Sequence, residues 1–192
     1  MKRQFAFFVL FVGVLFVAGA CAAETQTWQI DPVHSSSQFS VSHLGITTVR
    51  GVFEKTTGTV TYDPSDPKKT QIDATLDATT VNTRIEMRDK DLRSPNFLDV
   101  TKYPTITFKS KKTETAGAGK LKITGDLTIH GVTKEVVLDV DGPSKPVNAM
   151  GGERMGAEAT TKINRRDFGV NGAPGIAGDE ISIILDVELM RK

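Results

Sequence analysis

The chain has 192 residues, with 24 Lys and Arg against 23 Asp and Glu, and a formal net charge of +1 at pH 7. Charges this evenly balanced exclude the basic face with which proteins follow a nucleic-acid backbone, so no nucleic-acid partner is expected. A single cysteine, Cys21, excludes disulfides within the chain and zinc or iron–sulfur sites built from several cysteines.

Residues 1–23 are predicted to form a secretory signal peptide. A short basic stretch, 1–4, precedes an apolar run, 5–20, and small residues surround Cys21; these are the three parts of a signal. The apolar run is shorter than the roughly 20 residues that cross a bilayer, and no later run is as long, so no integral membrane span is expected. Cleavage near Ala23 leaves one domain, 24–192, and removes Lys2 and Arg3, which takes the formal charge from +1 to −1. Because 18–21 loosely resembles a lipoprotein box, a lipoprotein anchored through Cys21 is the alternative to an exported, soluble protein.

Apolar and polar residues alternate over most of the remaining chain. In chain order, weak or clear runs cover 39–41, 60–62, 71–77, 106–108, 121–129, 132–140, 155–159 and 181–189. A period of two predicts half-buried antiparallel strands. Gly131 separates two clear runs, which predicts a tight hairpin of 121–130 with 132–141. The Pro- and Gly-rich stretch 142–152 is expected to be a long loop.

One segment departs from this period and predicts a short helix. Residues 84–92 place Ile85, Arg88 and Leu92 near one helical face, and Ser94-Pro95 follows, where proline disfavours further helix. Many short strands with one helix and no second core segment predict a single all-β domain, either a closed antiparallel barrel or a sandwich.

The residues that could carry chemistry do not form a catalytic or metal-binding motif. His34, His43 and His130 are the histidines of the chain, and none belongs to an HxH or HExxH pair, so no metal site is expected. The serines lack the glycine-flanked turn of a hydrolase nucleophile. The mixed charges at 88–91 and 165–167 are typical of solvated ion pairs. We therefore expect a protein that is not an enzyme.

Several short segments, in their order and spacing, resemble the YceI-like family, the lipocalin-like polyisoprenoid-binding proteins that bacteria secrete. They are WQIDPVHS (28–35), FSVSHL (39–44), RGVF (50–53), the Arg-Asp and Leu-Arg-Ser pieces of 88–94, FLDV with YPTITF (97–108), GDLTIHGVTK (125–134) and NRRDFGV (164–170). The family often has histidine before Leu92, whereas this chain has Asp91, a carboxylate that would disfavour an anionic pyrophosphate nearby.

The resemblance implies an extended eight-stranded antiparallel lipocalin-like β-barrel with one short helix. It also implies a periplasmic location and no established catalytic activity. The expected partner is an apolar small-molecule lipid, a long isoprenoid or fatty-acyl-like chain held in the barrel interior. No cofactor is expected, apart from a bound polyisoprenoid lipid or isoprenoid quinone.

Two sets of residues are candidates for ligand contacts. An apolar lining is predicted from large side chains: Phe39, Val41, Phe53, Ile106, Phe108, Ile129 and Phe168. Their alternative is ordinary core packing, because an eight-stranded barrel is at the size where the interior is either filled or holds one small ligand. A polar mouth is predicted from Arg88 on the short helix with His34 or Arg165, since arginine is a common anion contact. The alternative for Arg88 is an ion pair with Asp89 that holds the helix in place.

The favoured function is therefore a periplasmic binding or carrier protein for an apolar chain. One alternative is a structural or stress-response exported protein whose barrel is filled by side chains. The other is an accessory to isoprenoid-quinone redox chemistry. The sequence contains no pattern that sets the headgroup of the ligand or the oligomeric state.

Overall fold

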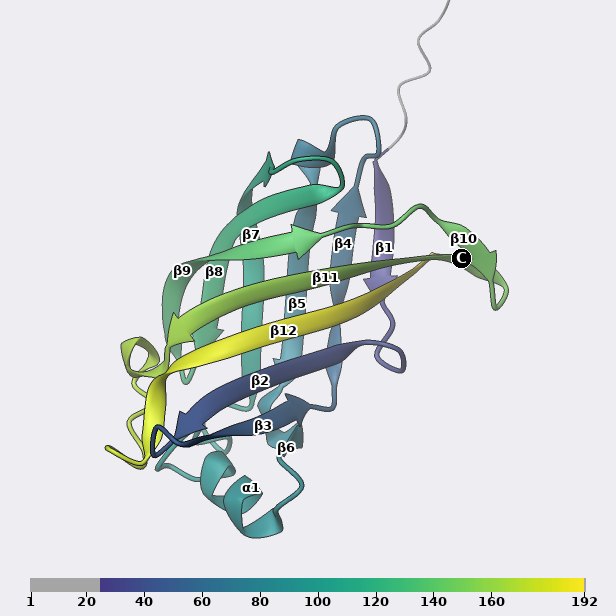
Figure 1. The fold of residues 1–192 in the computed structure, drawn as a ribbon. Helices are drawn as coiled ribbons and strands as arrows, with labels where there is room; N and C mark the ends of the chain where they lie inside the picture. Colours follow the sequence, from purple (N-terminus) through teal and green to yellow (C-terminus); the bar gives the residue numbers. More distant parts are fainter. Residues whose placement is uncertain (1–24, 192) are drawn as a thin grey trace, which may run out of the picture.

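In the computed structural model of the chain, residues 25–191 are described (Figure 1). The predicted signal peptide and Cys21 lie outside the described residues. Within residues 25–191 no helix is long and apolar enough to cross a membrane.

Strands make up most of the described chain. In order the strands are β1 (Gln26–Ile30), β2 (Ser36–His43), β3 (Thr47–Phe53), β4 (Thr56–Tyr62), β5 (Gln71–Asp77), β6 (Val81–Asn82), β7 (Thr105–Thr115), β8 (Lys120–Ile129), β9 (Val132–Asp141), β10 (Val147–Ala149), β11 (Gly152–Asn164) and β12 (Ala177–Arg191). The helix α1 covers Glu86–Arg93, and short 3-10 turns cover η1 (Pro67–Lys69), η2 (Ala78–Thr80) and η3 (Arg165–Phe168). Each run of alternation found in the sequence lies in one of these strands.

Eight of the strands in the described chain close into an antiparallel ring. The order around the ring is β1, β4, β5, β7, β8, β9, β11 and β12, and β12 returns to β1. One edge of β12 has two partners along its length. β1 pairs with Leu189 and Met190, and β2 pairs with 177–186. Strands β2, β3 and β6 continue the sheet from there, and β10 extends the end of β11 as an arm (Figure 1). The predicted eight-stranded antiparallel barrel with one short helix is confirmed.

The β8–β9 hairpin confirms the tight turn predicted at Gly131. The two strands pair from Lys120 with Asp141 to Ile129 with Val132. His130 and Gly131 form the turn with φ of 51° and 74°, as a two-residue hairpin turn of right-handed twist requires.

The segment 142–152 differs from the long loop that was expected. Its residues 147–149 form β10, which pairs with Gly152–Arg154 at the start of β11. A three-residue strand is too short for alternation to reveal, so the turn-forming residues around it dominated the sequence pattern.

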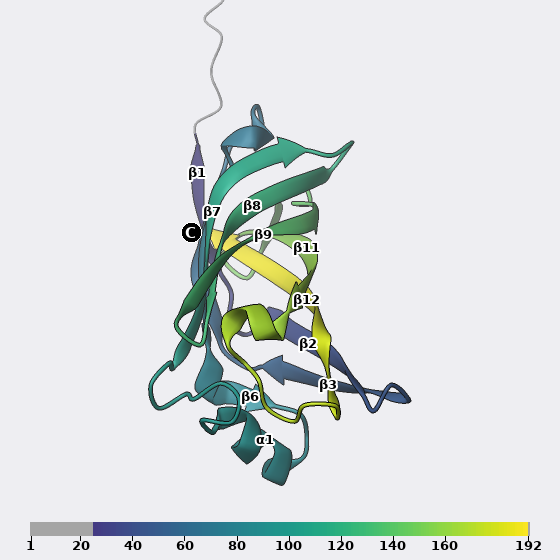
Figure 2. The same ribbon diagram turned by 90° about the vertical axis from the view of Figure 1, so that its left-hand side faces the viewer.

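The ends of the barrel differ in how they are closed. At one end Trp28 is fully buried among Ile30, Val60, Met155 and Leu189. Residues 83–104, including α1, cover the other end (Figure 2). There they meet the turn before β12, where Gly172 lies against the Phe97 ring. The structure confirms the predicted helix with a shift of one or two residues.

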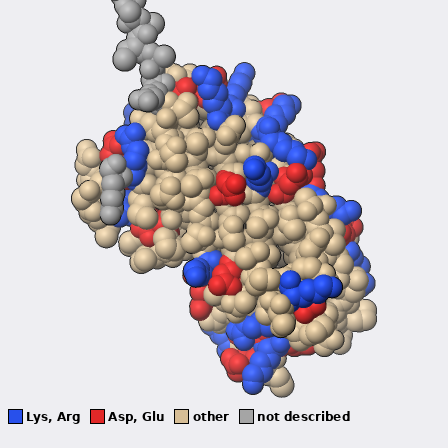
Figure 3. Space-filling model, turned by 180° about the vertical axis from the view of Figure 1, so that it is seen from behind, with Lys and Arg blue, Asp and Glu red and all other residues tan. Residues whose placement is uncertain are grey.

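Charges are interleaved on the outside of the barrel. On the face shown in Figure 3, Lys and Arg alternate with Asp and Glu, and broad uncharged areas separate them. Exposed cross-strand pairs also occur on the barrel, such as Lys122 with Asp139, 2.5 Å apart. No single-sign surface of the kind that follows a nucleic-acid backbone is visible on this face.

Candidate functional site

The barrel encloses an elongated apolar cavity of about 250 Å³. Its wall includes both Ala177 and Leu189, near the two ends of β12. From Ile181 to Leu189 every second residue of β12 lines the cavity, which at about 3.3 Å per residue makes this part of the wall roughly 26 Å long. Leu92, Phe97 and Leu98 complete the wall at the end that α1 covers.

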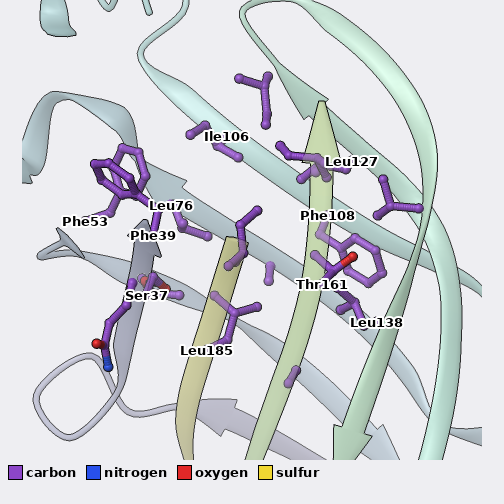
Figure 4. Close-up of a pocket in the computed structure, with 18 of the residues that line it drawn as sticks. Ser37, Phe39, Phe53, Leu76, Ile106, Phe108, Leu127, Leu138, Thr161 and Leu185 are labelled. Atoms are coloured by element: carbon purple, nitrogen blue, oxygen red, sulfur yellow. The ribbon is translucent and has the colours of Figure 1, made fainter. Parts of the chain in front are cut away.

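Four of the six hydroxyl groups on this wall are hydrogen-bonded within the protein. The hydroxyls of Ser37 and Thr56 are 2.7 Å apart, and the Thr161 hydroxyl donates to the Val137 carbonyl at 2.8 Å. Thr70 donates to the Pro67 carbonyl at 2.6 Å. Figure 4 shows Ser37 and Thr161 among the aliphatic and aromatic side chains of the wall. The surface offered to a guest is therefore almost entirely hydrocarbon.

The structure brings all seven predicted lining residues onto this wall. They come from β2, β3, β7, β8 and η3: Phe39, Val41, Phe53, Ile106, Phe108, Ile129 and Phe168. The Phe39 and Phe53 rings pack together with centroids 5.6 Å apart. Some of the seven, such as Phe168, are also buried members of the main hydrophobic core, so contact with a ligand stays a prediction.

Sequence reasoning missed many of the other lining residues. Leu127, Leu138 and Leu185 lie on strands whose alternation was recognised, and their inward phase in that pattern could have identified them. Leu92 lies on α1, where its spacing in the sequence had indicated only the helix, and Leu98 lies in the irregular segment after α1, where no periodicity gives a signal.

Arg165 lies at the wall, but its charge is turned away from the cavity. Its guanidinium donates to the carbonyls of Gly178, Val170 and Gly172 at 2.8 Å and of Ala177 at 3.1 Å. Burial lowers the pKa of Arg165 from its ordinary value. The guanidinium donors are bound to these backbone carbonyls, and Arg165 therefore holds the turn before β12 in place.

Arg88 also has partners in its own segment. Its Nε donates to the Thr83 hydroxyl at 2.8 Å, and its Nη2 donates to the Thr83 carbonyl at 2.9 Å. Asp89 accepts the Thr83 backbone N–H at 2.8 Å and the Thr83 hydroxyl. The neighbours Arg88 and Asp89 thus anchor α1 through Thr83. Asp91 is exposed on α1 and accepts a hydrogen bond from Asn96.

His34 belongs to a polar cluster outside the cavity, which we call the Asp31 cluster: Asp31, His34, Arg154 and Glu188. His34 Nδ1 is 2.9 Å from Asp31, and Arg154 contacts both carboxylates. The hydrogen bonds of Asp31 with His34, with the Val33 N–H and with Arg154 hold the pKa of the buried Asp31 carboxyl far below its usual range.

The predicted polar mouth is therefore not assembled. Arg165 lies at the cavity wall, whereas Arg88 and His34 do not line the cavity. The physical reason is that the His34 ring and the guanidinium groups of Arg88 and Arg165 each have hydrogen-bond partners close to them in the chain or in the sheet.

The Asp31 cluster is also the one group of metal-ligand type found among residues 25–191. One ligand atom each from Asp31, His34 and Glu188 lie within 4.8 Å of one another. However, the Arg154 guanidinium contacts both carboxylates, so a cation already occupies the position between them. The contacts describe a structural ion-pair network at the point where β1 and β2 share the edge of β12.

Comparisons with known proteins agree with this architecture. The family model of the YceI-like domain matches residues 28–189. The Protein YceI of Shigella flexneri is 37% identical over 178 residues, which cover 93% of both chains. The crystal structure of BcnA from Burkholderia cenocepacia superposes with a TM-score of 0.73 at 22% identity, covering 83% of this chain and 98% of that one. A Saccharophagus degradans domain, described as a polyisoprenoid binding domain implicated in plant cell wall breakdown, superposes with a TM-score of 0.65 at 13% identity, covering 86% and 98%.

Proposed function

This chain belongs to the YceI-like family, and we propose that it is a periplasmic carrier that holds a long isoprenoid or fatty-acyl-like chain inside its barrel. The proposal includes export directed by residues 1–23 and binding without catalysis. It rests on one observation above all, the elongated hydrocarbon-lined cavity.

The size of the cavity supports a carrier over a barrel filled by its own side chains. Its volume of about 250 Å³ exceeds the roughly 150 Å³ of an engineered apolar cavity that stays dry and binds benzene. Native protein interiors contain few voids larger than a water molecule, because unfilled space forfeits dispersion contacts. A void of this size in an otherwise packed barrel is therefore a feature of a ligand site.

The shape of the wall favours a chain-like ligand. Burying one methylene gains about 0.8 kcal/mol, so each five-carbon unit contributes roughly 3–4 kcal/mol, against an association cost on the order of 4–15 kcal/mol. Several units must therefore enter before binding is useful. The wall along β12, from Ile181 to Leu189, supplies that length. A polyisoprenoid lipid or the tail of an isoprenoid quinone has the required form.

The direct test is to identify what the protein carries. We expect native mass spectrometry of gently purified protein to show an added lipid mass, and extraction into organic solvent to release one apolar chain per protein. A bare protein that also fails to take up an added prenol would contradict the carrier proposal and favour the filled barrel. The released mass separates a simple polyisoprenoid from a quinone.

A further inference from the structure

Two glycines occupy positions on the inner wall where the strand pattern places large side chains. Gly51 of β3 pairs with the lining residue Phe39 of β2. Gly125 of β8 lies in the inward row between Ile123 and Leu127, and both glycines are buried. Neither has a positive φ, so the backbone there would accept any residue. Since glycine weakens a strand interior, the reason for it lies in the space that a side chain would occupy.

That space is taken by two phenylalanine rings. A Cβ placed on Gly51 would lie 2.5 Å from Cζ of Phe39, and one placed on Gly125 would lie 2.5 Å from Cζ of Phe108. Carbon atoms normally approach to about 3.5–4.0 Å. Each ring therefore lies directly against the backbone of the neighbouring strand. We call the space over each glycine that the ring occupies its seat, and only glycine leaves this space open.

The seats determine how far the rings project into the cavity. Both rings line it, and Figure 4 shows Phe39 with Phe53 on one side of the cavity and Phe108 on the other. The backbone of the wall lies behind each ring, so a methyl group in either seat moves the ring toward the bore. Glycine at these two positions thus keeps the bore wide at two places.

From this geometry we propose that Gly51 and Gly125 are specificity-determining residues that make the bore wide enough for a methyl-branched chain. The inference rests on the proposed function and narrows its ligand to isoprenoid chains, which carry a methyl branch on every five-carbon unit, over straight acyl chains. Because one extra methylene in an apolar pocket changes binding by about 10–200-fold, a ring displaced into the bore discriminates strongly against branches.

Gly51 is the better position for the test. The atoms nearest a Cβ at Gly51 are the far end of the Phe39 ring and the Thr83 methyl at 2.8 Å, all on side chains. At Gly125 the Lys109 carbonyl would lie at 2.6 Å, so alanine there strains the backbone as well. Thr83 anchors α1 through its hydroxyl. A Thr83→Ser background removes its methyl while keeping that hydroxyl, which leaves the ring as the group that must move.

The experiment compares two alcohols of equal main-chain length, branched geranylgeraniol and straight hexadecan-1-ol. In the Thr83→Ser background, we expect Gly51→Ala to weaken geranylgeraniol binding about tenfold or more and hexadecan-1-ol binding less than about threefold. Gly156→Ala is the matched control, because the atom nearest its Cβ is the Val187 carbonyl oxygen at an ordinary 3.7 Å. It should change neither affinity.

A second variant tests the role of the ring directly and covers the case in which Gly51→Ala alone does not fold. Adding Phe39→Leu removes the ring and should restore geranylgeraniol binding to within about threefold of the background protein. Equal losses for both alcohols, unchanged binding in folded Gly51→Ala, or no rescue by Phe39→Leu would overturn the inference while the carrier function stands. If the unsubstituted protein binds neither alcohol, the carrier function fails and the inference with it.

Discussion

Single charged residues in this protein take their roles from the groups around them. Arg165 reaches the wall of an apolar cavity, yet its guanidinium is directed to the carbonyls of Val170, Gly172, Ala177 and Gly178. A buried charge without such partners would be strongly destabilising. The sequence suggested Arg165 for a polar mouth, and the structure assigns it to holding a turn, because hydrogen-bond partners are a property of the fold.

The Asp31 cluster gives a stability contribution that depends on pH. Asp31 has a pKa in the folded protein far below the roughly 3.9 of an unfolded chain, so the folded state binds its proton less readily. The resulting stabilisation is complete above about pH 4–5 and is lost as the pH falls below that range. We expect Asp31→Asn to lower the free energy of unfolding by about 2 kcal/mol at pH 7, and by progressively less at pH 4 and pH 3.

Urea denaturation of the two proteins across this pH range measures the difference. Asp139→Asn is the control, since Asp139 forms an exposed pair with Lys122 and exposed pairs contribute little. A stability difference for Asp31→Asn that grows as the pH falls from 5 to 3 would contradict the role given to the carboxylate.

At the scale of elements, the covering segment 83–104 depends on one buried carboxylate. Asp89 of α1 accepts both donors of Thr83 and is 4% exposed. We expect Asp89→Ala to destabilise this segment by about 2–3 kcal/mol, because it leaves buried donors unpaired. Cleavage within 84–93 under limited proteolysis should therefore be faster, and release of a bound lipid should also accelerate if the segment closes the cavity.

Asp91→Ala provides the matched comparison on the same helix. Asp91 is exposed and its main partners are Ser94 and Asn96, so its loss should leave both rates nearly unchanged. Similar proteolysis of the two variants would mean that Asp89 does not anchor α1.

At the scale of the whole molecule, the apolar cavity makes the stability of the barrel depend on its ligand. A ligand that binds only the folded state adds about 2.7 kcal/mol to the free energy of unfolding at 100 times its Kd. We expect delipidated protein to have a lower Tm than protein saturated with geranylgeraniol. Filling the bore from inside by Ala159→Phe, at a residue that lines the cavity, should abolish this ligand-dependent rise in Tm.

Lys162→Phe places the same ring on the exposed side of β11 and is the control for the added aromatic group. Its Tm should still rise with the ligand. A rise in Tm that is equal for Ala159→Phe and the unsubstituted protein would place ligand binding somewhere other than the cavity.

The sequence by itself determined the local structure and the family. Alternation with a period of two identified eight of the twelve strands of the described chain, because burial on one side of a strand selects every second residue. The paired runs around Gly131 identified the β8–β9 hairpin, and the break in alternation identified α1. Short family segments such as 28–35 and 125–134 added the barrel and an apolar ligand as expectations.

Only the tertiary structure decided which groups meet. It joined β12 to β1, at the other end of the described chain, and so closed the ring, and it placed β2 beside β12 as well. It directed His34, Arg88 and Arg165 to separate partners, and it seated the Phe39 and Phe108 rings on Gly51 and Gly125. The physical reason is that a residue's periodicity depends on its neighbours in sequence, whereas its hydrogen bonds and the space left to it depend on strands brought alongside from elsewhere.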